Sequence, residues 1–149
     1  MVKAVLSELG TVWFGEVRMQ PGKPQGFGHV GEDRVPIFAL PGNPVSSYVS
    51  FQVFVLPALR KLMGRTPYTR PASQARLAEP LRSAPGKKQF VRAVHHYDGS
   101  GAHVTPVGGH GSHLLGDLAT ANALVVLPED AHHVEQGALV EVLLLDRDY

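Results

Sequence analysis

Residues 39–48 read ALPGNPVSSY, and this stretch decides how the N-terminal half of the chain folds. The apolar run Val35–Leu40, which leads into it, predicts a strand that ends at a turn. Asn43 is a favoured N-cap residue, and Pro44 suits the first position of a helix. The stretch therefore predicts a buried strand, a tight turn and a helix that begins at Pro44.

The start of this predicted helix carries the groups of an anion site. The first N–H groups of a helix lack partners within the helix and lie at the positive end of its dipole. Ser46 and Ser47 place two hydroxyl groups beside them. An oxyanion or phosphate can bind at such a position. Composition alone leaves open the alternative, a capped helix whose serines bond only to their own backbone.

The flanking segments give the N-terminal half the pattern of an α/β domain. Val2–Leu9 has apolar residues at helical spacing, and Val12–Met19 is rich in strand-forming residues. A helical period continues over residues 44–63, although Pro57 should kink or divide that helix. We therefore expect residues 1–72 to form part of a three-layer sheet domain.

The second half, residues 73–149, has the pattern of a small β-domain. The proline-containing segment TPYTRPA precedes it, and the charge changes from eight Lys and Arg against four acids in residues 1–73 to six against nine in residues 74–149. Short β-rich runs follow, interrupted by one helix, and their spacing indicates a small barrel or sandwich. The predicted strands are Phe90–His96, His103–Val107, Ala123–Leu127 and Leu139–Leu145, and the predicted helix is Ser112–Leu118.

The composition is that of a globular protein and excludes several kinds of partner. Hydrophobic residues make up 44% of the 149 residues, and the absence of cysteine excludes disulfides and thiolate chemistry. The formal net charge of +1 is too small to indicate nucleic acid or an anionic membrane as the partner. The N-terminal segment reads as neither a signal peptide nor a membrane span. A cytoplasmic location fits these features, and any anion is expected to bind at a local site.

Three further motifs carry candidate side chains. PGKP at residues 21–24 fixes the backbone around Lys23, which is either an anion ligand or a solvated loop lysine. KKQFVRA places Arg92 on the same strand face as Phe90, where it either meets an anion or points to solvent from an edge strand. GGHGSHL at residues 108–114 is a glycine-rich turn into a helix, with Ser112 as the N-cap, and can form a second anion cradle.

Two other patterns are discounted. GFGHVG at residues 26–31 has the spacing of a dinucleotide fingerprint, but it lies between two strand candidates rather than before a helix, so we interpret it as a turn. The histidines, including His110 and His113, lack the spacing and the carboxylates of a zinc site. We therefore predict no metal site in this chain.

Five ordered motifs carry a family resemblance: MQPGKPQGFG, ALPGNPVSSYVSF, KKQFVRA, GHGSHLLGDLATANALVVLPED and EQGALVEVLL. Together they resemble molybdopterin molybdenumtransferase, the family of MoeA and the gephyrin E domain, over about residues 2–145. The resemblance implies molybdenum cofactor biosynthesis, in which molybdate is inserted into adenylylated molybdopterin with release of AMP and with Mg2+ as the cation. It also implies the C-terminal part of a three-layer molybdopterin-binding α/β domain over residues 1–72 and a small β-barrel domain over residues 73–149.

The resemblance further implies an anion site that is assembled from separate motifs. These residues supply the kinds of donor that a dianion requires, and the proposed mechanism needs no nucleophile from the chain. The residues that would bind molybdate are Lys23, Ser46, Arg92 and Ser112, and those that would shape the substrate cleft are Pro41, Gly42, Asn43 and Pro44.

The chain departs from the family pattern in two ways. Many members have a second basic residue just before PGKP, where this chain has Gln20, and Arg18 is a candidate substitute. The family's aspartate-bearing segment, to which the resemblance would assign the metal, and its N-terminal domains do not appear in this sequence. We therefore expect a C-terminal fragment of a homodimeric enzyme, inactive by itself and prone to self-association through uncovered strands and helices.

The alternative function is that of a gephyrin-type scaffold or peptide-binding module without catalysis. Such a role predicts an exposed apolar groove near the junction of the two halves. The presence of four candidate anion donors, drawn from separate motifs, favours the enzyme.

Overall fold

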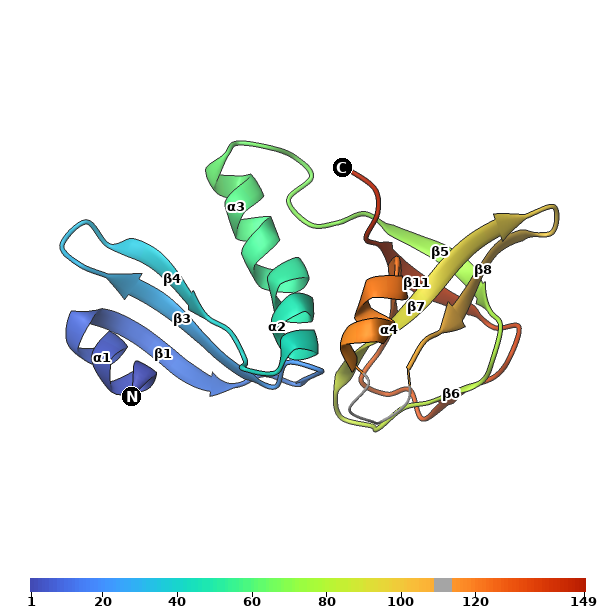
Figure 1. The fold of residues 1–149 in the computed structure, drawn as a ribbon, viewed down its shortest axis with the longest axis horizontal. Helices are drawn as coiled ribbons and strands as arrows, with labels where there is room; N and C mark the ends of the chain where they lie inside the picture. Colours follow the sequence, from blue (N-terminus) through green and yellow to red (C-terminus); the bar gives the residue numbers. More distant parts are fainter. Residues whose placement is uncertain (109–113) are drawn as a thin grey trace.

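The computed structural model describes residues 1–108 and 114–149. Figure 1 shows an N-terminal part, a helix that stands beside it, and a C-terminal barrel that is reached through an extended linker. The elements of the N-terminal part are α1 (Val2–Leu9), β1 (Gly10–Glu16), β2 (Met19–Gln20), β3 (Pro24–Val30), β4 (Val35–Ala39), α2 (Pro44–Ser50), the π-helical segment η1 (Phe51–Val55) and α3 (Leu56–Leu62).

The three strands β1, β3 and β4 form an antiparallel sheet with β3 in the centre. Val12 of β1 and Ile37 of β4 both lie opposite Gly28. The prediction of a turn at GFGHVG is therefore wrong, because most of this motif lies in β3. A β-carbon at Gly28 would collide with the backbone carbonyl of Thr11, so the glycine allows β3 to approach β1 closely. The motif continues through a turn into β4 rather than into a helix.

The long helix predicted from residue 44 is present, and η1 divides it. The Leu56 N–H donates to the Phe51 carbonyl, which is the five-residue spacing of a π-helix. Pro57 lies in the first turn of α3, where its missing N–H removes no bond from that segment. Pro57 thus divides the helix as predicted, without ending it. In residues 1–108 and 114–149, no helix is long and apolar enough to cross a membrane.

The C-terminal part is a closed barrel of five strands in the order β7–β8–β5–β11–β9, and the pairing of β9 with β7 closes it. All four strands predicted there are present, as β7, β8, β9 and β11. Among the residues that the structure describes, ten form its buried interior, including Leu77, Val104, Val125 and Val142. The elements are β5 (Ala72–Leu77), β6 (Leu81–Arg82), β7 (Lys88–Asp98), β8 (Gly101–Pro106), α4 (Leu114–Thr120), β9 (Ala123–Leu127), β10 (His133–Val134) and β11 (Leu139–Leu144).

Three strands of this half were not predicted. β5 shows only a weak alternation of buried and exposed residues, because only Ala75 and Leu77 are buried. β6 and β10 are strands of two residues that pair with each other, and they are too short to show a pattern. The change from helix to barrel falls near residue 72, where β5 begins. The division of the chain into domains at residues 1–72 and 73–149 stays a prediction.

The two parts are joined by backbone pairing and by a shared apolar core. Strand β2 pairs in parallel with β7, with Met19 opposite Lys88 and Gln20 opposite Gln89. Around this pairing, a second core combines residues of both parts. Its buried members are Met19, Val49, Phe90, Leu124 and Val126. Because Val49 belongs to α2, this core fixes the helix against the barrel.

The linker between the parts is held at Arg70. Its guanidinium donates to the carbonyls of Leu144 (2.6 Å) and Arg147 (2.8 Å). The guanidinium groups of Arg60 and Arg70 both lie over the ring of Tyr149, at 4.0 and 4.7 Å from the ring centroid. These contacts connect α3 and the linker to the end of the barrel chain.

Candidate functional site

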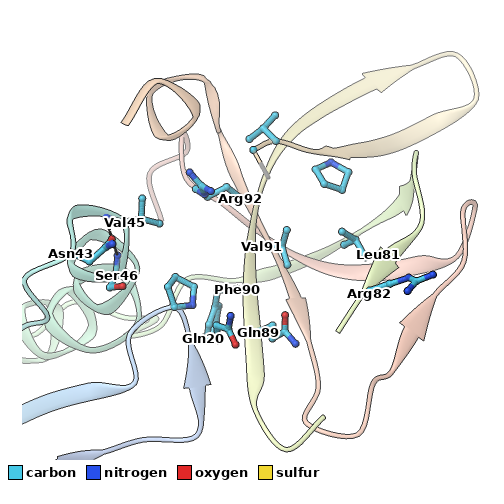
Figure 2. A pocket seen from close by; sticks show the side chains of 14 residues that line it. Gln20, Asn43, Val45, Ser46, Leu81, Arg82, Gln89, Phe90, Val91 and Arg92 are labelled. Atoms are coloured by element: carbon cyan, nitrogen blue, oxygen red, sulfur yellow. Dashed lines mark hydrogen bonds between the residues drawn. The ribbon is translucent and has the colours of Figure 1, made fainter. Parts of the chain in front are cut away.

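An open pocket of about 400 Å3 lies where α2 meets the barrel (Figure 2). Its walls come from the start of α2, from β2 and the residue after it, from β6, from β7 and from the end of β8. The lining residues are Gln20, Pro21, Asn43, Val45, Ser46, Leu81, Arg82, Gln89, Phe90, Val91, Arg92, Pro106, Val107 and Gly108. Residues from both halves of the chain thus line the pocket, as expected for a site that is assembled from separate motifs.

The start of α2 is a closed cap rather than a row of free donors. The Asn43 Oδ1 accepts hydrogen bonds from the Val45 N–H (3.0 Å) and the Ser46 N–H (3.3 Å), and the Ser47 N–H donates to the Asn43 carbonyl. The predicted N-cap is confirmed, whereas the expected free N–H groups are occupied. The capping partner is Asn43 and not the serines. From α2, Val45 and Ser46 line the pocket, and Ser46 is the polar residue of the two.

Replacing Asn43 with alanine is expected to lower the free energy of unfolding by about 1 kcal/mol, because two backbone N–H groups lose their acceptor. Asn43→Ser, which keeps a capping oxygen, is expected to retain most of that stability. Urea unfolding followed by circular dichroism measures both variants. Equal stability of the alanine and serine variants would contradict this role for the cap.

Arg92 lies within β7, which is paired on both sides, so it is not an edge-strand arginine. Its backbone lies opposite Leu124 of β9, and the residue is only 9% exposed. Neighbouring side chains on the same strand face, such as Phe90, pack into the core between the two parts. Figure 2 shows the guanidinium on the side of β7 that faces Val45 and the start of α2. The strand therefore holds a buried positive charge at the pocket wall.

Most of the other predicted site residues do not line the pocket. Lys23 does not line the pocket, and its ammonium group pairs with the Glu16 carboxylate at 2.9 Å. Of the four predicted cleft residues, Asn43 lines the pocket, whereas Pro41, Gly42 and Pro44 do not. Ser112 lies outside the described residues. The structure thus brings together Ser46, Asn43 and Arg92, and the roles of all eight residues stay predictions.

Three polar residues of the pocket were not predicted as ligands. Gln20, Arg82 and Gln89 line it, and Gln89 is buried. The Gln89 side-chain amide donates to the Ser83 hydroxyl at 2.6 Å and to the Ala84 carbonyl at 3.2 Å. Gln20 reaches the pocket only because β2 pairs with β7, a long-range contact that no local pattern in the sequence indicates.

A cluster of serine, histidine and aspartate lies on the β7–β8 hairpin, but its geometry is not that of a hydrolase. The Ser100 hydroxyl donates to the Asp98 carboxylate at 2.7 Å and also lies 2.7 Å from His103 Nε2. The same nitrogen faces Asp98 at 3.4 Å, so one imidazole nitrogen meets both partners, whereas a triad uses the two different nitrogens. The hydrogen bonds from Ser100 lower the pKa of Asp98, which stabilises an exposed hairpin turn. Among the described residues, no group of three or more His, Cys, Asp or Glu side chains could hold a metal ion.

Two family models match successive parts of the chain. The first, described as a probable molybdopterin binding domain, matches residues 1–61. The second, described as the MoeA C-terminal region (domain IV), matches residues 74–145. Together they span most of the chain and meet at the pocket, since Ser46 comes from the first region and Arg92 from the second.

Named relatives agree with these matches. The chain is 42% identical to molybdopterin molybdenumtransferase 1 of Mycobacterium tuberculosis over 97% of its length, and 33% identical to gephyrin of Dictyostelium discoideum over 97% of its length. These matches cover 35% and 23% of the two relatives, so the chain spans about a third or less of their length.

Solved structures share the fold. A molybdopterin biosynthesis MoeA protein from Pyrococcus horikosii matches 97% of this chain and 34% of its own, with 30% identity and a TM-score of 0.80. A molybdenum cofactor biosynthesis protein from Pyrococcus furiosus matches 91% of this chain and 46% of its own, with 32% identity and a TM-score of 0.73. The chain belongs to the MoeA family and carries its molybdopterin-binding α/β region followed by its C-terminal β-barrel region.

Proposed function

We propose that the protein acts in molybdenum cofactor biosynthesis by inserting molybdate into adenylylated molybdopterin with release of AMP. Relatives with more than 40% identity carry the name of that transferase. The observation that carries the proposal is the pocket between α2 and the barrel, whose lining includes both Ser46 and the buried Arg92. Because the chain spans about a third of these relatives, the activity is proposed for the whole protein that contains these regions.

In this proposal, the role of the chain is to hold the anion in place. A guanidinium presents several N–H donors in a fixed plane, and a charge-assisted hydrogen bond to an oxyanion is about twice as strong as a neutral one. The Ser46 hydroxyl on the facing helix can donate to another oxygen of a tetrahedral anion. Holding molybdate beside the reacting group of the pterin lowers the entropic part of the barrier and requires no protein nucleophile.

Magnesium is the expected cation of the reaction, but this part of the chain offers it no ligand set. Mg2+ prefers carboxylate and water oxygens in octahedral geometry, and the described residues contain no such group of acids. We therefore assign no metal ligand to residues 1–108 and 114–149, and no step is routed through the ion.

We also propose that the protein is a homodimer in the cytoplasm and that this chain associates with itself. The support is an aromatic row across the N-terminal sheet. Trp13 lies opposite Phe27, which lies opposite Phe38, and the last two rings are 4.9 Å apart. Trp13 is 52% exposed and Phe27 is 45% exposed, so the row leaves apolar surface in water.

Substituting serine at both Trp13 and Phe27 is expected to shift the chain towards the monomer in sedimentation velocity experiments. The control is Tyr97→Ser, because Tyr97 is more exposed but lies on the distant β7–β8 hairpin. If the double variant and the control sediment like the wild type, the sheet face is not the contact surface.

A second candidate function is peptide binding, as proposed for a gephyrin-type module. An apolar groove of about 380 Å3 lies on the barrel wall. It is lined by apolar residues with Lys88 and Glu141 among them, and its Leu139 is 58% exposed. This groove is separate from the pocket that holds Arg92, so the two candidate functions use different surfaces and can be tested separately.

Calorimetric titration of the chain with molybdate at low salt, with sulfate as competitor, tests the proposed function. The expected result is saturable binding that sulfate weakens, because both ions are tetrahedral dianions. The absence of oxyanion binding, combined with binding of an apolar peptide that a charge at Leu139 abolishes, would favour the second candidate instead.

A further inference from the structure

Tyr149 and two arginines form a cluster where α3 and the C-terminus lie at the same end of the molecule (Figure 1). Arg60 belongs to α3, Arg70 to the linker, and Tyr149 follows β11. Both guanidinium groups lie within 5 Å of the centroid of the tyrosine ring. The three residues, which we call the Tyr149 clasp, therefore connect the helix and the linker to the end of the barrel chain.

Hydrogen bonds from Arg70 reach the same three parts of the chain. Its Nη1 donates to the carbonyls of Leu144 and Arg147, which lie at the end of β11 and beyond it. Its Nη2 donates to the side-chain oxygen of Gln52 in η1 at 3.2 Å. One planar guanidinium thus bridges the helix and the end of the barrel, which the compact ammonium of a lysine cannot do.

The clasp holds two positive charges without an acid. Arg60 is only 8% exposed, and its Nε donates to the Pro67 carbonyl at 2.8 Å. Among the ion pairs of residues 1–108 and 114–149, none includes Arg60 or Arg70. The electron-rich face of the Tyr149 ring attracts both cations. Its hydroxyl is buried and has no hydrogen-bond partner among the described residues, so the ring, and not the hydroxyl, makes the contact.

The helix that carries Arg60 also forms one wall of the pocket. Residues 44–62 form a single helical stretch through α2, η1 and α3, and Val45 and Ser46 at its start line the pocket. Near the pocket, Val49 packs into the core that both parts share. Ser46 and Arg60 lie about 20 Å apart along the axis, at 1.5 Å per residue. The helix is therefore held at both ends, by the shared core at its start and by the clasp at its end.

We propose that Tyr149, Arg60 and Arg70 are positioning residues for the pocket. The clasp fixes the tilt of the helix against the barrel and so sets the spacing between Ser46 and β7. This inference rests on the proposed function, because it takes the pocket as the molybdate site. Loss of the clasp lowers the fraction of molecules whose pocket walls have the binding spacing, and the apparent affinity falls with that fraction.

The first test measures the orientation of the helix. The chain has no cysteine, so Leu62→Cys on α3 and Tyr97→Cys on the β7–β8 hairpin introduce spin labels at two exposed positions. Double electron–electron resonance is expected to give one narrow distance distribution, both with Tyr149 intact and with Tyr149→Phe, which keeps the ring. Tyr149→Leu removes the ring and is expected to broaden the distribution. Equal widths for the phenylalanine and leucine variants would overturn the proposal.

The second test is the molybdate affinity of the unlabelled variants. Tyr149→Leu is expected to weaken binding about threefold to tenfold, the size of one lost cation–π contact, whereas Tyr149→Phe is expected to bind like the wild type. Arg70→Lys keeps the charge but loses the planar fork, so we expect it to weaken binding as well. The stability control is Gly137→Ala, which strains a turn with φ +82° at the end of β11 opposite to Leu144. It is expected to lose thermal stability and to bind like the wild type.

The outcomes separate this inference from the proposed function. If the wild-type chain binds no molybdate, the proposed function fails and the positioning role fails with it. If the wild type binds but Tyr149→Leu and Arg70→Lys bind equally well, only the positioning role is overturned, even where the distance distribution broadens. A loss of affinity in Gly137→Ala as large as that in Tyr149→Leu would also overturn it, because the effect would then follow stability rather than the clasp.

Discussion

Gly28→Ala is expected to destabilise the N-terminal sheet by about 3 kcal/mol or more, the upper range for inserting atoms into a packed structure. The added β-carbon would collide with the Thr11 carbonyl and lie 2.6 Å from the α-carbon of Val12. Both atoms belong to the backbone of β1, so no side-chain rotation relieves the collision. Separation of β1 from β3 would disrupt the centre of a three-stranded sheet.

The measurement is urea unfolding followed by tryptophan fluorescence, since Trp13 is the single tryptophan and lies in β1. Gly99→Ala is the matched control, because a β-carbon there has no atom within 4 Å and the residue does not have a positive φ. An unfolding free energy for Gly28→Ala within about 0.5 kcal/mol of the control, the usual range for surface substitutions, would contradict the close strand approach.

Arg92→Ala is expected to weaken molybdate binding by about tenfold to a hundredfold, the effect of removing a charged hydrogen-bond partner. The side chain is buried at the pocket wall, where solvent screens its charge less than at the surface. Lys23→Ala is expected to have a much smaller effect, about threefold or less, because Lys23 lies outside the pocket and its charge is paired with Glu16.

Calorimetry of the two single variants and of Arg76→Ala measures this difference. Arg76 is an exposed arginine of β5 whose side chain bonds to the Gly137 carbonyl, away from the pocket, so its loss controls for net charge. A larger effect of Lys23→Ala than of Arg92→Ala would mean that the anion binds at the PGKP loop and not at the pocket wall.

Much of the fold could be predicted from sequence, because its strongest signals are local. The turn and cap at ALPGNP predicted where β4 ends and where α2 begins. Apolar periodicity predicted α1 and four barrel strands. β3 was missed because glycine and proline are depleted in strands, and only the close packing against β1 explains their presence. The two-residue strands β6 and β10 have no periodicity to detect.

The site was less predictable, because it depends on which segments meet. Arg92 could be recognised as a charge within an apolar strand pattern, and Ser46 as a hydroxyl at a helix start. The inclusion of Gln20 and Gln89 depends on the parallel pairing of β2 with β7, across almost 70 residues of chain. Asn43 was predicted as the cap, but its occupation of the first N–H groups of α2 depends on the side-chain conformation, which composition does not determine.

The most direct test of the central claim is a crystal of the chain soaked in molybdate, with anomalous diffraction recorded at the molybdenum absorption edge. We expect one dominant anomalous peak in the pocket between α2 and β7, within hydrogen-bonding distance of Arg92 and on the side of Ser46. A dominant peak at another surface, such as the one lined by Arg82, His132 and His133, with none beside Arg92, would contradict it.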